Sequence, residues 1–204
     1  MTITSVEKTR NKDMMRIFID NHYAFTIPQE DYIRNRLYEE EEISEDKLHH
    51  IRQNVLIHAA RERAVRYLMI KDRSEGELIR KLMDSGFDED VAKSATEALK
   101  AIGYLNDIRY AMKYLSERVK NKALSKKALR FELEHKGIDP SIIEGALSEF
   151  ETDDEEVALR AARKKFGKYN LNEQKIEQKL LSFLYHRGFS FEVGKRVLVR
   201  LKAE

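Results

Sequence analysis

Apolar residues recur along this chain in a pattern that repeats at an interval of 51 residues. A glycine marks the same point in each copy, at Gly86, Gly137 and Gly188. Leucines lie four and eight residues before each glycine, at Leu78, Leu82, Leu129, Leu133, Leu180 and Leu184. Alanines keep the same register further upstream, at Ala60, Ala111 and Ala162. Such spacing places the residues on one face of a helix, and the regular repeat predicts an array of stacked helices.

Capping residues divide each copy into three helices. Ser74 and Glu77 have the S-x-x-E spacing of a capping box, and Gly86 ends that helix with a residue that tolerates the left-handed conformation. A long helix is expected from Ser44 to about Ile70. The other predicted caps are Asp88, Asn106, Ser125, Asp139 followed by Pro140, Thr152, Asn172 and Ser190.

The first helix of each triplet carries an apolar stripe that we interpret as core. Its spacings of three and four residues are those of one helix face. Tyr104 is likewise interpreted as a structural residue. The stripe residues are Ile57, Ala60, Ala64 and Tyr67, then Ile108, Ala111 and Leu115, then Leu159, Ala162, Phe166 and Tyr169.

The N-terminal part has a different period. Ile17 and Ile19 alternate with Arg16 and Phe18, and Tyr23, Phe25 and Ile27 alternate with Ala24 and Thr26, on either side of Asp20-Asn21-His22. Alternation of this kind predicts a β-hairpin, which is only marginally stable alone and should rest on a helix. Pro28–Tyr38 is expected to form a short helix.

Together these patterns predict a mainly α fold: a tandem array of three three-helix repeats, elongated and curved, with a small N-terminal β-hairpin. The predicted segments are residues 1–43 for the hairpin and short helix, 44–103 for the first repeat, 104–151 for the second and 152–204 for the third. An extended array of this kind favours function through a surface over function in a pocket.

Composition narrows the class of protein. Charged side chains make up 36% of the chain, and there is no cysteine, which excludes disulfides, zinc–thiolate sites and cysteine nucleophiles. No apolar stretch approaches the roughly 18 residues of a membrane-spanning helix, and the N-terminus lacks the apolar segment of a signal peptide. We expect a soluble cytoplasmic protein without membrane contact.

Motifs of catalysis are scarce. The sequence has neither a glycine-rich nucleotide loop nor G-x-S-x-G. His49 and His50 point to different sides of a helix, and His58 lies about two turns further on, too far for simple chelation. The acidic run Glu39–Glu42 is interpreted as a solvated linker because it lacks the interleaved ligands of a calcium loop. We predict no catalytic residue, no metal site and no cofactor.

Basic residues provide the candidate chemistry. Residues 1–50 hold 7 Lys/Arg against 11 Asp/Glu, whereas residues 51–204 hold 31 against 25. Outward basic positions in successive repeats of a solenoid would line one surface, which suits phosphate backbones or an acidic protein groove. Aromatic residues are expected mostly at core positions, so single-strand stacking is not expected. The predicted binding residues are Arg61, Arg66, Arg73, Arg109, Lys113, Lys126, Lys127, Arg130, Arg160, Lys164 and Lys168.

The chain resembles the RecX family, bacterial regulatory proteins that modulate the RecA recombinase. The resemblance is carried by RAVRYLMIKDRSEGELIRKLMDSGF at residues 63–87, GYLND at 103–107 with Tyr110-Ala111, and ELEHKGI at 132–138, and it extends from about residue 45 to the C-terminus. It implies a non-enzymatic protein that lies in the groove of the RecA–DNA filament and most often inhibits filament growth, ATP hydrolysis and strand exchange. Weak, sequence-independent contact with single- and double-stranded DNA and a monomeric state are expected.

Two other functions stay open at this stage. Capped helix triplets also present recognition helices to DNA, although the helices starting at Asp88, Asp139 and Ser190 have few base-reading side chains in their first turns, which leaves phosphate contact. A protein-scaffolding solenoid is the other alternative, although the 51-residue unit is longer than the repeats of common scaffolds.

Overall fold

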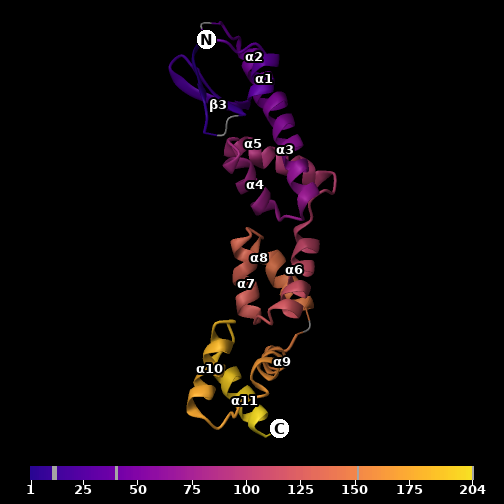
Figure 1. Cartoon of the computed structure of the whole chain (residues 1–204). Coiled ribbons are helices and arrows are strands. Elements are labelled where there is room, and N and C mark those ends of the chain that lie inside the picture. The colour runs from indigo at the N-terminus through magenta and orange to yellow at the C-terminus, as the bar shows by residue number, and fades with distance from the viewer. Residues whose placement is uncertain (11–12, 40, 151, 204) are drawn as a thin grey trace. The chain divides into compact units, whose positions relative to one another are not determined.

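The protein forms two compact units, Met1–Asn106 (unit 1) and Asp107–Glu204 (unit 2). The computed structural model describes residues 1–10, 13–39, 41–150 and 152–203, and Figure 1 traces them in chain order. Unit 1 contains a small sheet and one helix triplet, and unit 2 contains two triplets. The division into four segments stays a prediction, and Glu40 of the predicted acidic linker lies outside the described residues.

The N-terminal sheet has three antiparallel strands in the order β1-β2-β3: Ile3–Lys8, Met14–Ile19 and His22–Pro28. The predicted hairpin is therefore part of a larger sheet. Its turn is tighter than expected, because the two residues between the strands, Asp20 and Asn21, form it with positive φ angles of 48° and 65°. The sequence of β1 offers only Ile3 and Val6 as apolar residues, too few for an alternating pattern.

The helices of unit 1 follow the sheet. They are α1 Gln29–Arg34, α2 Glu45–His50, the π-helical segment η1 Ile51–Leu56, α3 Ile57–Ile70, α4 Glu75–Asp84 and α5 Glu89–Ala101. The helix expected from Ser44 to Ile70 is continuous through α2, η1 and α3 but contains a π segment. Ile51 and Leu56 are both buried, and their spacing of five residues suits the wider turn of a π-helix.

Unit 2 repeats one arrangement twice. The second triplet consists of α6 Asp107–Asn121, α7 Lys126–His135 and α8 Pro140–Glu149. The third consists of α9 Asp154–Phe166, α10 Gln174–Tyr185 and α11 Phe191–Lys202. Within each triplet every helix packs against the other two.

The repeated leucines form the centre of each triplet, as the sequence predicts. All six are at most 1% exposed. In unit 1, Leu78 and Leu82 share one hydrophobic cluster with Met14 and Phe25 of the sheet, so the strands rest on the helices. A β-carbon at Gly86 would lie 3.4 Å from Cγ of Met14, which shows how closely the end of α4 approaches β2.

The two triplets of unit 2 are in close contact at Gly188. Its φ is +83°, and a β-carbon there would lie 2.5 Å from Oγ of Ser125 and 2.7 Å from Cβ of Ala128. The amide of Ser125 also donates to the carbonyl of Arg187 at 3.0 Å. Only glycine satisfies both the left-handed backbone and the close contact.

Five of the predicted N-caps are confirmed, Ser44 among them, and three differ. Ser74 and Glu77 form a complete capping box, and Ser125, Asp139 and Ser190 accept hydrogen bonds from the first turns of their helices. Asp88 stands at the cap position of α5, but its carboxylate accepts the hydroxyl of Tyr23 at 2.5 Å instead of capping. The cap of α9 is Asp153 and not Thr152, and α10 starts after Glu173 and not after Asn172.

Three residues expected in the core are exposed: Tyr104, Ile108 and Tyr169. Tyr169 fell on the predicted stripe because we extended the helical spacing beyond Phe166, where α9 ends. Ile108 lies in the first turn of α6 and Tyr104 in the connection before it, where Leu105 and Asp107 are the buried residues instead.

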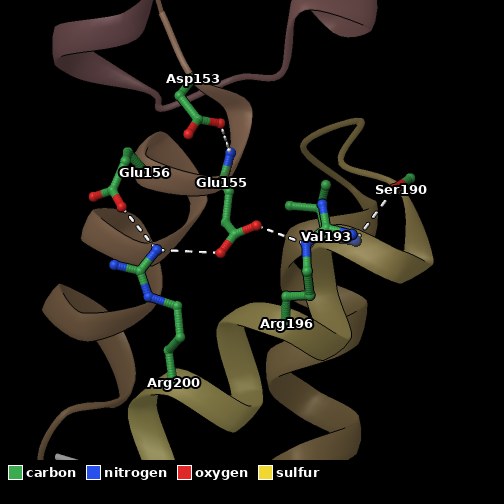
Figure 2. A network of polar contacts seen from close by, with 7 residues as sticks. All are labelled: Asp153, Glu155, Glu156, Ser190, Val193, Arg196 and Arg200. Carbon is green, nitrogen blue, oxygen red and sulfur yellow. Dashed lines mark hydrogen bonds and ion pairs between the residues drawn. The ribbon is translucent and has the colours of Figure 1, made fainter.

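An ion-pair network joins the start of α9 to α11 (Figure 2). Glu155 accepts from Nε of Arg196 at 2.6 Å and from Nη1 of Arg200 at 3.1 Å, and Glu156 accepts from the same Nη1 at 2.7 Å. Asp153 caps the helix by accepting the amide of Glu155. Hydrogen bonds from Arg196 and then from Arg200 hold the pKa of the Glu155 carboxyl below its ordinary value of 4.5.

Replacing Leu133 with alanine tests the repeat core. Leu133 is fully buried, so we expect the free energy of unfolding to fall by roughly 2–5 kcal/mol. Urea denaturation followed by circular dichroism measures the change. Phe131→Ala is the matched control, because this larger side chain lies on the same helix but is 60% exposed, and it should change stability by less than about 0.5 kcal/mol. Equal effects of the two substitutions would show that the repeat core is misassigned.

The Glu155→Gln variant tests the network of Figure 2. Since the pKa of Glu155 is lower in the folded than in the unfolded chain, its ionised carboxylate stabilises the fold above its ordinary value of 4.5, and this contribution is lost as pH falls through the lower folded value. The variant should therefore unfold at a lower urea concentration than the parent at neutral pH, and the gap should close in acid. Glu117→Gln, an exposed glutamate of α6, should show no such pH-dependent gap. A gap that persists unchanged in acid would contradict the assigned role.

Candidate nucleic-acid interface

The predicted basic residues of unit 1 have different surroundings. Arg66 is exposed on α3, whereas Arg61 is half-buried and lines a cavity of about 510 Å³ beside α1 and η1. Arg73 follows the end of α3, and its guanidinium carbon lies 5.8 Å from the centre of the Tyr67 ring. The structure therefore does not place these three residues in one uniform stripe.

In the second triplet the predicted residues lie on two helices. Arg109 and Lys113 are exposed one turn apart on α6. Lys126 is half-buried at the start of α7, and its backbone amide donates to Asp154 at 3.0 Å. Lys127 and Arg130 are exposed on α7, but Nη2 of Arg130 lies 2.8 Å from a carboxylate oxygen of Glu144. That ion pair reduces the charge that Arg130 offers to a partner.

The third triplet presents a basic face on α9. Arg160 and Lys164 are exposed one turn apart, on the opposite side of the helix from the buried Leu159, Ala162 and Phe166. Lys168 is also exposed, but it follows the last residue of α9 and does not continue the helical stripe as predicted.

A cleft between α9 and α10 gathers a second set of basic residues. Its volume is about 800 Å³. The lining residues are Lys165, Phe166, Tyr169, Lys175, Ile176, Gln178, Lys179, Ser182, Phe183, His186 and Arg187. None of the described residues that line it is an aspartate or a glutamate, so the positive charges are not neutralised from within the cleft. We refer to it below as the repeat-3 cleft.

Aromatic rings form one side of the repeat-3 cleft and hold two of its cations. Phe166 and Phe183 pack edge to face with their ring centres 5.5 Å apart. Nζ of Lys165 lies 4.3 Å, and the guanidinium carbon of Arg187 3.8 Å, from the centre of the Phe183 ring. These are cation–π distances, which fix the two charged groups without a carboxylate partner.

Arg187 is also held by the backbone. Its Nε donates to the carbonyl of Lys122 at 3.0 Å. Partial burial lowers the pKa of this guanidinium, because desolvation disfavours the charged form. An arginine remains protonated at neutral pH despite such a shift. Arg187 therefore carries a partly desolvated positive charge, which favours the binding of an anion.

Our sequence reasoning missed the repeat-3 cleft, although a signal was present. Lys175, Lys179, Ser182 and His186 follow spacings of three and four residues, which place them on one side of α10. The predicted binding residues include none from α10. The expectation that aromatic residues lie mostly in the core was also wrong in part, since Tyr169 is 58% exposed.

The described residues contain no group of three or more histidines, aspartates and glutamates arranged to hold a metal ion. Every described helix is too short or too polar to span a bilayer.

Family models match all three triplets. The first RecX three-helix domain matches residues 60–99, the second 106–147 and the third 153–198. Regulatory protein RecX of Clostridium botulinum (strain Eklund 17B / Type B) is 30% identical over 96% of this chain and 94% of its own length. Regulatory protein RecX of Clostridioides difficile (strain 630) is 32% identical over 98% of this chain and 95% of its own.

Solved structures agree with these matches. A crystal structure of regulatory protein RecX has a TM-score of 0.62 and 26% identity, and the match covers 96% of this chain and 98% of that one. The crystal structure of RecX from Lactobacillus salivarius also has a TM-score of 0.62, over 74% of this chain and 99% of its own, at 25% identity. With all three repeats matched in order, this chain belongs to the RecX family.

Proposed function

We propose that this chain is a non-enzymatic regulator that binds the RecA–DNA filament in its helical groove and inhibits RecA's ATPase activity, filament growth and strand exchange. The names of the relatives support a regulatory role, since they are called regulatory protein RecX. The resemblance to the RecX family implies that the target is RecA and that the effect is inhibition. We extend both to this chain.

The observation that carries the proposal is the exposed basic surface of the third repeat. Arg160 and Lys164 project from α9, and no ion pair is found for either among the described residues. Side chains of this kind bind phosphates or the acidic surface of a protein. A filament of protein wound on DNA offers both.

A second function is DNA binding through the phosphate backbone without RecA. The repeat-3 cleft favours it, because its lysines and arginine face no carboxylate among its lining residues. The two functions differ in their response to salt. Phosphate binding weakens steeply between about 50 and 200 mM salt, whereas a packed protein interface is less affected.

Titration of the purified protein into RecA's single-stranded-DNA-dependent ATPase assay tests the proposal. We expect inhibition at ratios well below one protein per RecA, because a protein that blocks filament growth acts on many protomers at once. The RecA should come from the same organism, and the salt should be moderate. Absence of any effect would leave DNA binding alone as the function.

The triple variant Arg160→Glu/Lys164→Glu/Lys168→Glu tests, in the same ATPase assay, whether this basic face of the third repeat is the binding surface. It should keep its helicity by circular dichroism, since all three side chains are exposed, and lose most of the inhibition. The matched control is Arg160→Lys/Lys164→Arg/Lys168→Arg, which retains the charge and should inhibit like the parent. If the charge-reversed variant inhibits equally well, this face of α9 is not part of the binding surface.

A further inference from the structure

The repeat-3 cleft contains aromatic and apolar side chains, which a surface that binds only phosphates does not require. Apolar and aromatic side chains line it together with the cations, and one of its rings stands open to solvent. Tyr169 is 58% exposed, and its ring packs only at a tilt against Phe166, with the ring centres 6.0 Å apart. Its backbone amide donates to the carbonyl of Phe166 at 2.9 Å, so the turn after α9 fixes its position.

We propose that the repeat-3 cleft binds a short segment of single-stranded nucleic acid, with a base stacked on Tyr169 and phosphates bound by Lys175, Lys179 and Arg187. The proposal deepens the proposed function, because it names the part of the chain that contacts a DNA strand. It does not require RecA to be present.

The geometry favours a single strand over a duplex. Binding of single strands combines a positive groove for the backbone with aromatic faces on which bases stack. A duplex keeps its bases stacked on one another, so it has no base face to offer a tyrosine. The backbone of a duplex would therefore contact only the basic residues of the cleft, and the aromatic side of the cleft would have no partner.

One cation of the cleft, Arg187, is held in place by contacts within the protein before any ligand binds. Lys175 and Lys179 are exposed one turn apart on α10. The guanidinium of Arg187 lies on the Phe183 ring, and its Nε donates to the carbonyl of Lys122. A site whose charged groups are already positioned loses less conformational entropy when an anion binds.

An acidic peptide is the main competing occupant. Its carboxylates would satisfy the lysines, but a peptide rich in Asp and Glu has no flat face for Tyr169. The combination of an exposed ring with carboxylate-free cationic lining is thus better matched by nucleotides.

Fluorescence anisotropy with the full-length protein and no RecA tests the proposal. The probes are a labelled oligo-dT of about 15 nucleotides, which covers the usual site size, and a duplex of the same length. Inorganic polyphosphate and a poly-glutamate peptide serve as competitors without bases. We expect the single strand to bind more tightly than the duplex and to resist both competitors.

Substitutions separate stacking from charge. Tyr169→Ala should weaken oligo-dT binding by about 5-fold or more, and Tyr169→Phe should restore it, since the ring is what stacks. Lys175→Ala/Lys179→Ala should reduce the slope of log affinity against log salt by roughly 1.4, the value for two phosphate contacts with a single strand.

Matched controls come from residues outside the cleft. Phe191→Ala removes a ring of similar exposure on α11, 56% against 58% for Tyr169. Lys93→Ala/Lys195→Ala removes two exposed lysines that do not line the cleft. Neither control should change oligo-dT affinity.

Three results would overturn the proposal: equal binding of single strand and duplex, unchanged affinity of Tyr169→Ala, or displacement of oligo-dT by polyphosphate or poly-glutamate at matched charge concentration. The last result would make the cleft a general anion site. Because RecA is absent, failure here is distinct from failure of RecA inhibition.

Discussion

The burial of paired leucines under a glycine-terminated helix is the interaction on which this structure depends. In each triplet the second helix, α4, α7 or α10, directs two leucines one turn apart into the core and ends at a glycine with positive φ. Deleting one such side chain removes its hydrophobic contribution and leaves a cavity, so the pair tolerates little variation. The glycine then turns the chain sharply into the third helix.

This packing decides which surfaces remain for function. Since the core uses one face of each helix, the opposite faces are free to vary between triplets. In the third triplet α9 uses its free face for Arg160 and Lys164, and α10 contributes Lys175 and Lys179 to a cleft. In the second triplet Arg130 on α7 is instead paired with Glu144 on α8. The same scaffold therefore carries different surface chemistry in successive repeats.

The sequence was a good guide to features that are local and periodic. The leucine positions, the capping box at Ser74 and the left-handed glycines follow from spacing and backbone preference, and the structure confirms them. The strand β1 was missed because it forms by pairing with β2, and its sequence, Ile-Thr-Ser-Val-Glu-Lys, has no alternation of apolar and polar residues that would reveal it.

The candidate site was predicted less well than the fold, since surface position depends on where helices end and what lies across from them. By sequence spacing, Lys168 continues the basic stripe of α9 and Tyr169 its apolar stripe. The helix ends at Phe166, however, so neither residue lies on the helix face predicted for it. Arg130 is among the predicted binding residues, yet it forms an ion pair with Glu144 on the next helix. The repeat-3 cleft combines residues from two helices and the turns that follow them, which no single periodic stripe predicts.

Hydroxyl-radical footprinting of the protein bound to saturating RecA–single-stranded-DNA filament, read by mass spectrometry, tests the central claim most directly. The claim is that the basic surface of the third repeat faces the filament. The account predicts that labelling of the exposed Tyr169 ring falls strongly on binding, together with labelling of the α9 peptide that carries Arg160 and Lys164. Unchanged labelling of both at saturation would contradict it and would place the filament contact elsewhere on the chain.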